Sequence, residues 1–172
     1  YANSGAQSVL YENFLMELLA KSCGGVDSFN MLTFRKAMAE TKMLSTDVTT
    51  AYDPKYASVF EKRNTAYLSH GLKLEKYTGA RGKSGSSEAN GDFVAQITDI
   101  FAKNSIPWQT GELGKIDAGG GGTISCYMAK LGMDVIDCGV PVLSMHAPVE
   151  VISKIDLYYL YLGYKAFIEN IR

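Results

Sequence analysis

The sequence predicts an α/β layered fold, and two patterns along its 172 residues indicate this class. Segments with alternating or β-branched residues are separated by segments whose apolar residues recur at helical spacing. Strands that alternate with helices are typical of a sheet covered by helices. The composition is 47% hydrophobic and 20% charged, which excludes a disordered chain and a coiled-coil rod. We expect one domain over residues 1–172.

The charge balance excludes several classes of partner. Lys and Arg number 17 and Asp and Glu 18, so the net charge is −1. A chain with this balance has no general attraction to nucleic acid or to anionic lipid. Its apolar stretches are too short to span a bilayer, and its first residues have no signal-peptide pattern. The three cysteines lack a CxxC spacing, which predicts reduced thiols and a cytoplasmic location.

The first quarter of the chain predicts a helix and then a strand. The capping box Ser4–Gln7 is expected to begin a helix that Cys23-Gly24-Gly25 ends. Phe29–Glu40 is either a short helix or a covering loop. Lys42–Val48 is expected to be a strand, followed by a turn at Asp53-Pro54. The apolar face of the first helix would consist of Val9, Leu10, Phe14, Leu18 and Leu19.

The middle of the chain predicts a strand, a loop and a helix. Gly71–Tyr77 alternates apolar and charged residues, which indicates an edge or one-sided strand. Thr78–Asn90 is rich in Gly, Ser and charge and is expected to be an exposed loop. Asp92 is a plausible N-cap for a helix that ends at about Lys103, and Ile106–Gln109 begins a short strand. The inward residues of that helix would be Phe93, Ile97, Ile100 and Phe101.

The last third predicts buried strands and a long helix. The glycine loop Gly119–Ile124 leads into a helix over Ser125–Leu131. The apolar runs Asp134–Val140 and Val142–Met145 are expected to be strands covered on both faces. The last helix is expected over Pro148–Asn170, because proline is favoured at the first helical position. Its buried stripe would consist of Ile152, Ile155, Tyr159, Leu162 and Ala166.

Two side chains are candidate metal ligands. His146 follows a predicted strand and Asp47 ends another, and ligand sites collect at the carboxyl ends of strands in open α/β sheets. A carboxylate and an imidazole suit Zn²⁺. Without a family match, a hydrogen-bonded structural histidine and a turn or cap aspartate are the more common interpretations of such residues. A catalytic zinc site needs about three protein ligands, and the sequence has neither HExxH nor a Glu-Glu pair.

The glycines at 119–122 are a second candidate feature. They permit close approach of the backbone to a ligand, and their N–H groups can polarise a carbonyl or bind an anion. A tight connection between elements is the alternative. His70, the other histidine, lies on a predicted turn, where it would approach the site, contact a neighbouring subunit or face solvent.

Four segments resemble a known family when taken in order along the chain. Asp137–Ala147 (DCGVPVLSMHA) resembles the D-x-G-x-P-x-L-S-M-H-S signature of zinc aminopeptidases of the aspartyl aminopeptidase and yeast vacuolar aminopeptidase I family. Gly120–Ile124 resembles the family's G-G-T-I loop. Ser45–Tyr56 resembles its S-A-D-x-x-H-A-x-x-P-N-Y motif. Asn3–Asn13 resembles the segment that follows the family's Glu-Glu pair.

The resemblance implies a three-layer α/β/α fold with a mixed sheet and a site with two zinc ions. Asp47 would bind one ion and His146 the other, while Gly121, Gly122 and Thr123 would line the pocket of a peptide substrate. In such enzymes a glutamate deprotonates a water that attacks the N-terminal peptide bond. Family members form homo-oligomers that reach dodecamers.

The resemblance also implies that this chain is the C-terminal portion of a catalytic domain. The family's first histidine ligand, bridging aspartate, Glu pair and dimerisation domain would all lie upstream of residue 1. We therefore expect no catalytic residue in the chain and no activity from it alone. Thr50 stands where many members have a histidine, and Asp117-Ala118-Gly119 differs from the usual D-x-P-C-G, so a preference for acidic residues does not follow. The alternatives are a non-catalytic scaffold and an unrelated α/β protein that binds an anion.

Overall fold

A six-stranded mixed sheet forms the centre of the computed structural model, which describes residues 3–81, 84–115 and 118–171. The longest strand, β8, pairs in parallel with β1 and β2 and antiparallel with β3 and β9, and β3 pairs in parallel with β6. The expected mixed sheet is therefore confirmed. The strands are β1 (Lys42–Ser45), β2 (Val48–Thr50), β3 (Leu72–Glu75), β6 (Trp108–Thr110), β8 (Asp134–Leu143) and β9 (Val151–Ile152).

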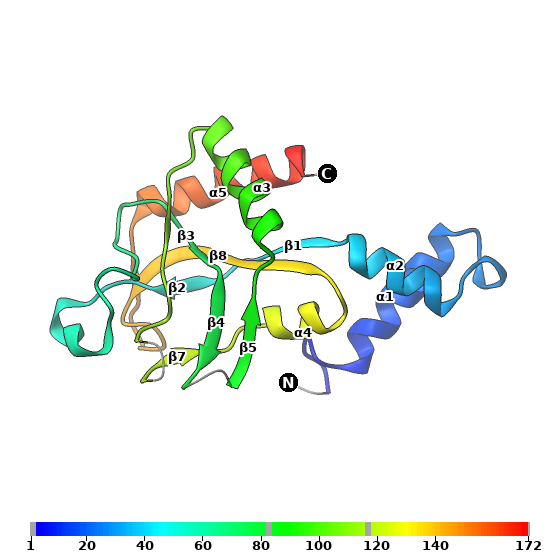
Figure 1. The fold of residues 1–172 in the computed structure, drawn as a ribbon, viewed down its shortest axis with the longest axis horizontal. Helices are drawn as coiled ribbons and strands as arrows, with labels where there is room; N and C mark the ends of the chain where they lie inside the picture. The colour runs from blue at the N-terminus through cyan, green and yellow to red at the C-terminus, as the bar shows by residue number, and fades with distance from the viewer. Residues whose placement is uncertain (1–2, 82–83, 116–117, 172) are drawn as a thin grey trace.

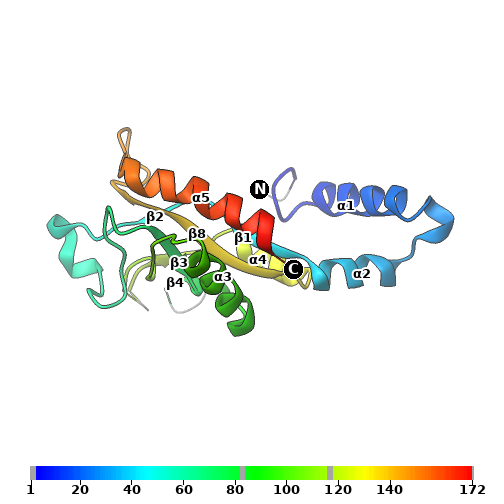
Figure 2. The same ribbon diagram turned by 90° about the horizontal axis from the view of Figure 1, so that it is seen from above.

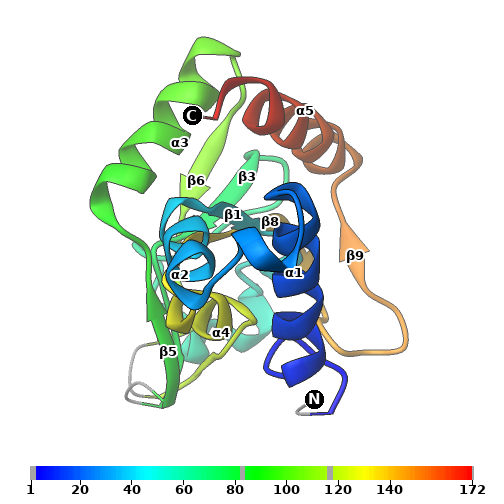
Figure 3. The same ribbon diagram turned by 90° about the vertical axis from the view of Figure 1, so that its right-hand side faces the viewer.

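Helices cover both faces of this sheet, as expected for three layers (Figures 1 and 3). One face carries α3 and α5, and the other carries α4 and a small sheet formed by β4, β5 and β7. The helices are α1 (Val9–Ser22), α2 (Met31–Glu40), α3 (Gly91–Lys103), α4 (Ser125–Lys130) and α5 (Lys154–Asn170), with 3-10 turns η1 (Val26–Ser28) and η2 (Pro54–Val59). The small sheet consists of β4 (Tyr77–Ala80), β5 (Ser84–Glu88) and β7 (Gly120–Gly121).

Successive side chains of β8 point to opposite faces of the sheet and contribute to two separate apolar cores. Ile136 and Cys138 pack beneath α3 and α5, whereas Val135 packs against α4 and α2. A strand buried on both faces must be apolar almost throughout, which explains the long apolar run in the sequence. The predicted inward face of α3 is confirmed, since all four of its residues are buried there. Among the described residues, no helix is both long and apolar enough to cross a membrane.

Helix α1 differs from its prediction in its start and in its buried face. It begins after Ser8, whose side chain makes no capping hydrogen bond, and not at the Ser4 capping box. Four of the five residues expected to be inward are more than half exposed. The face that packs against the second core carries Tyr11, Leu15 and Leu19. Because α1 is apolar on more than one side, its spacing could not identify this face. Together α1 and α2 form a hairpin that projects from the body (Figure 2).

The prediction of an edge strand followed by an exposed loop is wrong. Strand β3 lies between β8 and β6, and its charged residues Lys73 and Glu75 are only 0% and 3% exposed. The segment expected to be a loop instead forms the β4–β5 hairpin, in which Thr78 pairs with Ser87. Backbone pairing with β7 and β5 outweighs the weak strand propensity of these Gly and Ser residues.

Three boundaries near the other elements also differ. Asn90, and not Asp92, caps α3, because its side chain accepts the N–H of Asp92. The two strands expected on either side of Pro141 are one continuous strand, β8. Helix α5 begins after Ser153 and not at Pro148, because β9 first pairs with β8. In the expected stripe of α5, Ala166 is buried but Ile155 is exposed.

Candidate active site

A cavity of about 560 Å³ lies between the large sheet and the layer of α4 and β7. Its wall is formed by the ends of strands, by the glycine segment (Gly120–Ile124) and by the first turn of α4. The residues that line it are Ser45–Thr50, Glu75, Gly85, Leu113, Gly120–Ile124, Cys126, Tyr127, Asp137–Gly139, Met145 and His146. The five residues to which the family resemblance assigns a role are among them, namely Asp47, Gly121, Gly122, Thr123 and His146.

Asp47 reaches this cavity from the break between β1 and β2, where the sequence predicts one strand over Lys42–Val48. Its carboxylate Oδ1 accepts the N–H of Val48 at 2.7 Å, and the residue is exposed. The backbone here runs very close to β8. A Cβ on Gly139 would lie 1.8 Å from the carbonyl oxygen of Asp47, so only glycine fits at this position of β8. The D-x-G part of the signature therefore has a direct steric role beside Asp47.

His146 follows the end of β8 in a tight turn. Both Ser144 and His146 have positive φ angles, 59° and 68°, which are uncommon for residues with a side chain. The N–H of His146 donates to Glu150 Oε1 at 2.5 Å and helps to hold this turn. The turn places the exposed His146 in the lining of the same cavity that Asp47 lines.

The glycine segment begins in the small sheet as β7 and reaches the large sheet at Thr123. In β7, Gly120 has a φ of 95°, and a Cβ there would lie 2.2 Å from the oxygen of Gly79 in β4. Glycine is thus required for the close approach of the two strands. Thr123 next donates its hydroxyl to Asp137 Oδ2 at 2.9 Å and accepts the N–H of Ser125 at 3.2 Å.

Two acidic residues of the cavity were not assigned a role by the sequence analysis. Asp137 of β8 and Glu75 of β3 are partners in the antiparallel register, and both are nearly buried. Burial raises the pKa of each carboxyl group above its ordinary value. For Glu75 the sequence contains a usable signal, because the alternation in GLKLEKY places Lys73 and Glu75 together on the face of the strand opposite Leu72 and Leu74.

Glu75 is part of a buried ion pair. Lys73 Nζ lies 2.6 Å from Glu75 Oε1, and the hydroxyl of Thr49 also donates to that oxygen. On its other side Lys73 Nζ donates to the carbonyl oxygen of Glu112 at 3.0 Å. Loss of hydration is the largest cause that lowers the pKa of Lys73 and raises that of Glu75, while their mutual attraction opposes both shifts. Burial also raises the pKa of Glu112 to about 6.

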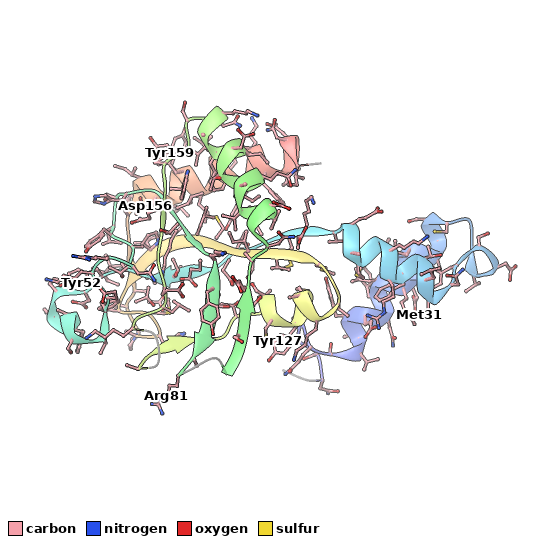
Figure 4. All side chains as sticks on the ribbon, in the orientation of Figure 1. Met31, Tyr52, Arg81, Tyr127, Asp156 and Tyr159 are labelled. Atoms are coloured by element: carbon pink, nitrogen blue, oxygen red, sulfur yellow. The ribbon has the colours of Figure 1, made fainter. Side chains whose placement is uncertain are left out.

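His70 lies outside the described lining of the cavity. It is exposed, its Nδ1 lies 2.8 Å from the carbonyl oxygen of Leu68, and its ring centroid is 6.0 Å from that of Tyr67. Asp156, buried on α5, accepts the N–H groups of Ser69 and Gly71 and fixes the turn (Figure 4). Asp117, which was considered above as part of Asp117-Ala118-Gly119, lies outside the described residues.

The donors at this site fit zinc only in part. Asp47 and His146 supply a carboxylate oxygen and an imidazole nitrogen, both of them common zinc ligands. In the part of the chain that the structure describes, no three His, Cys, Asp or Glu side chains gather as a metal site would require. Thr50, where many relatives were expected to have a histidine, lines the cavity with a hydroxyl group.

Comparison with known proteins decides the family. Residues 1–168 match the family described as "Aminopeptidase I zinc metalloprotease (M18)". The chain belongs to this family. The resemblance read from the four motifs is therefore confirmed, and the alternative of an unrelated α/β protein is wrong.

Relatives within the M18 family extend this result. A protein of Clostridium acetobutylicum called probable M18 family aminopeptidase 1 is 50% identical over 167 residues, which are 97% of this chain and 35% of that protein. The crystal structure of an M18 aminopeptidase from Thermotoga maritima superposes with a TM-score of 0.91 at 38% identity, over 99% of this chain and 37% of that one.

A more distant match shows the fold alone. The S. cerevisiae mApe1 dodecamer gives a TM-score of 0.73 at 20% identity, over 96% of this chain and 34% of that one. The chain thus spans about a third of the length of the M18 relatives that it matches.

Proposed function

We propose that residues 1–172 are the C-terminal portion of the catalytic domain of a zinc aminopeptidase that removes N-terminal residues from peptides. The observation that carries this proposal is the cavity, in which Asp47, His146 and the glycine segment meet although they are far apart in the sequence. Membership of the M18 family supplies the class of reaction.

Each residue then has a role at the cavity. Asp47 would bind one zinc ion from the break between β1 and β2, and His146 would bind a second one from the turn after β8. Zinc, when bound, polarises the scissile carbonyl and lowers the pKa of water. Gly121 and Gly122 would let the peptide backbone approach closely, and Thr123, tied to Asp137, would hold this segment in place.

The remaining parts of the site would come from outside these residues. A general base must reach the attacking water, and we assign none in this chain. The other zinc ligands are also missing from the described cavity. The isolated chain would therefore be inactive. We further propose that the complete protein is a cytoplasmic homo-oligomer, with the S. cerevisiae dodecamer as a precedent of the same fold.

The test compares the isolated chain with the full-length gene product that contains it. Both are loaded with zinc, metal content is measured by mass spectrometry, and hydrolysis of leucine p-nitroanilide is followed. The proposal expects zinc and turnover only in the full-length protein, and loss of both in Asp47→Asn and His146→Ala. His70→Ala is the matched control, because His70 is an exposed histidine outside the cavity lining. Turnover by the isolated chain would refute the missing-base argument.

A non-catalytic scaffold is the second candidate. It is favoured by the scarcity of ligands, since the described residues supply two donors where a catalytic zinc site needs about three. This alternative expects a full-length gene product that folds but binds no zinc tightly. Two zinc ions per subunit would exclude it.

A further inference from the structure

The wall of the cavity along β3 and β8 is acidic. Glu75 and Asp137 are cross-strand partners, and both line the cavity while being nearly buried. Side chains of directly paired residues have their Cβ atoms about 5 Å apart. The two carboxyl groups therefore form one acidic patch.

The buried ion pair is oriented relative to this cavity. Glu75 belongs to the lining, whereas Lys73 is fully buried and outside it. Lys73 Nζ is turned toward the carbonyl of Glu112, and Gly111 leaves room for it, since a Cβ there would lie 2.9 Å from Lys73 Cε. The pair thus presents its negative end to the cavity and its positive end to the protein interior.

No arginine or lysine is among the cavity-lining residues that the structure describes. Arg81, at the end of β4, is exposed and extends away from the body (Figure 4). His146 lines the cavity from the turn after β8, whereas Glu75 lines it from β3. The charged side chains that β3 and β8 contribute to the described lining are therefore acidic.

We infer that Glu75, oriented by Lys73 and reinforced by Asp137, selects against acidic side chains at the substrate's first residue and favours neutral or basic ones. This inference rests on the proposed aminopeptidase function and specifies its substrate class. A carboxylate brought beside Glu75 meets a like charge in a partly dehydrated site, whereas a guanidinium meets an opposite one. Because Lys73 lies 2.6 Å behind Glu75 and offsets part of its charge, a substrate charge about 6 Å from Glu75, at an effective dielectric constant of about 20, changes an equilibrium by roughly several-fold, in opposite directions for an acidic and a basic side chain.

The test reverses the ion pair. In Lys73→Glu/Glu75→Lys the net charge and the pairing are kept, but the positive end now faces the cavity. We measure kcat/KM for arginine, leucine and aspartate p-nitroanilides with the zinc-loaded full-length gene product. The ratio of arginine to aspartate cancels any general loss of activity. We expect a ratio above one for the natural sequence and a fall of at least tenfold in the exchanged variant.

Two further variants keep the test decisive. Lys73→Met/Glu75→Met replaces the pair with apolar residues of similar size, a change that buried ion pairs often tolerate, and it should bring the ratio close to one. Lys42→Asp/Asp134→Lys is the matched control. It exchanges another ion pair on the same sheet, 3.7 Å apart and outside the cavity lining, and it should leave the ratio unchanged.

The outcomes separate this inference from the proposed function. If leucine is hydrolysed but the natural sequence prefers aspartate, or if a folded pair variant keeps the natural ratio, the role of Glu75 is wrong and the peptidase function stands. If the zinc-loaded protein hydrolyses none of the three substrates, the proposed function is refuted and this inference falls with it.

Discussion

Replacement of Gly139 by alanine is the sharpest test of how β8 shapes the site. The added Cβ would meet the carbonyl oxygen of Asp47 at 1.8 Å, and the neighbouring carbonyl carbon at 2.9 Å. Both contacts are with backbone, so no side chain can rotate away. The segment that carries Asp47 must therefore retreat from β8 by about 1 Å or more, and a displacement of that size at a reacting centre can lower activity by about a hundredfold.

The stability cost is expected to be smaller than the functional one. Overpacking of a tight interior site typically costs about 1–3 kcal/mol of unfolding free energy. Asp47 lies between two short strands and not inside one, so it can shift while β1 and β2 stay paired with β8. We expect Gly139→Ala to fold in the full-length protein, with weaker zinc binding.

The assay combines zinc titration, kcat/KM for a leucine substrate and thermal unfolding. Gly91→Ala is the control, because a Cβ at Gly91 meets nothing within 4 Å and Gly91 is the first residue of helix α3. If Gly139→Ala retained zinc affinity and activity equal to those of the control, the steric account of the D-x-G motif would be refuted.

Three other predictions follow from the buried pair, the exposed helix and one perturbed carboxyl group. Lys73→Met alone should cost about 3–5 kcal/mol in urea unfolding, because it leaves Glu75 buried without its partner, whereas the double methionine variant should be close to neutral. Equal costs for the single and double variants would contradict this. Phe14→Ser should reduce self-association of the isolated chain in light scattering, because Phe14 is 62% exposed on α1; unchanged scattering would show that this face is not involved. The pKa of Glu112 is raised from 4.5 to about 6, so its carboxyl group binds a proton more tightly in the folded state than in the unfolded state. The stability that this difference contributes is present below about pH 4.5 and is lost as the pH rises through 6. Chemical unfolding across that range should show this slope, and Glu112→Gln should remove it.

The motifs predicted which residues to examine, and the structure brought those residues to one cavity. Asp47, His146 and the glycine segment were selected from short patterns, each of which is local in the sequence. Local patterns of this kind also predicted α3 correctly, because its apolar residues lie on one side only. They failed for α1, which is apolar on several sides, and for β4 and β5, whose Gly and Ser residues have little strand propensity of their own.

The charged face of β3 illustrates the remaining limit. An alternating strand with lysine and glutamate is expected at an edge, where water solvates the charges. Burial becomes tolerable only when a partner and further hydrogen bonds replace that water, and here Thr49 and the carbonyl of Glu112 provide them. Both groups come from distant segments, so no window of the sequence around β3 contains them.

The sequence by itself determined the family, the order of most elements and the identity of the candidate ligands, since these depend on residue types at fixed spacing. Only the tertiary structure decided which faces are buried, that an acidic pair lines the cavity and that its lysine lies behind it. These features depend on which distant segments pack together, and hydration or burial of a charge is a property of that packing and not of the residue.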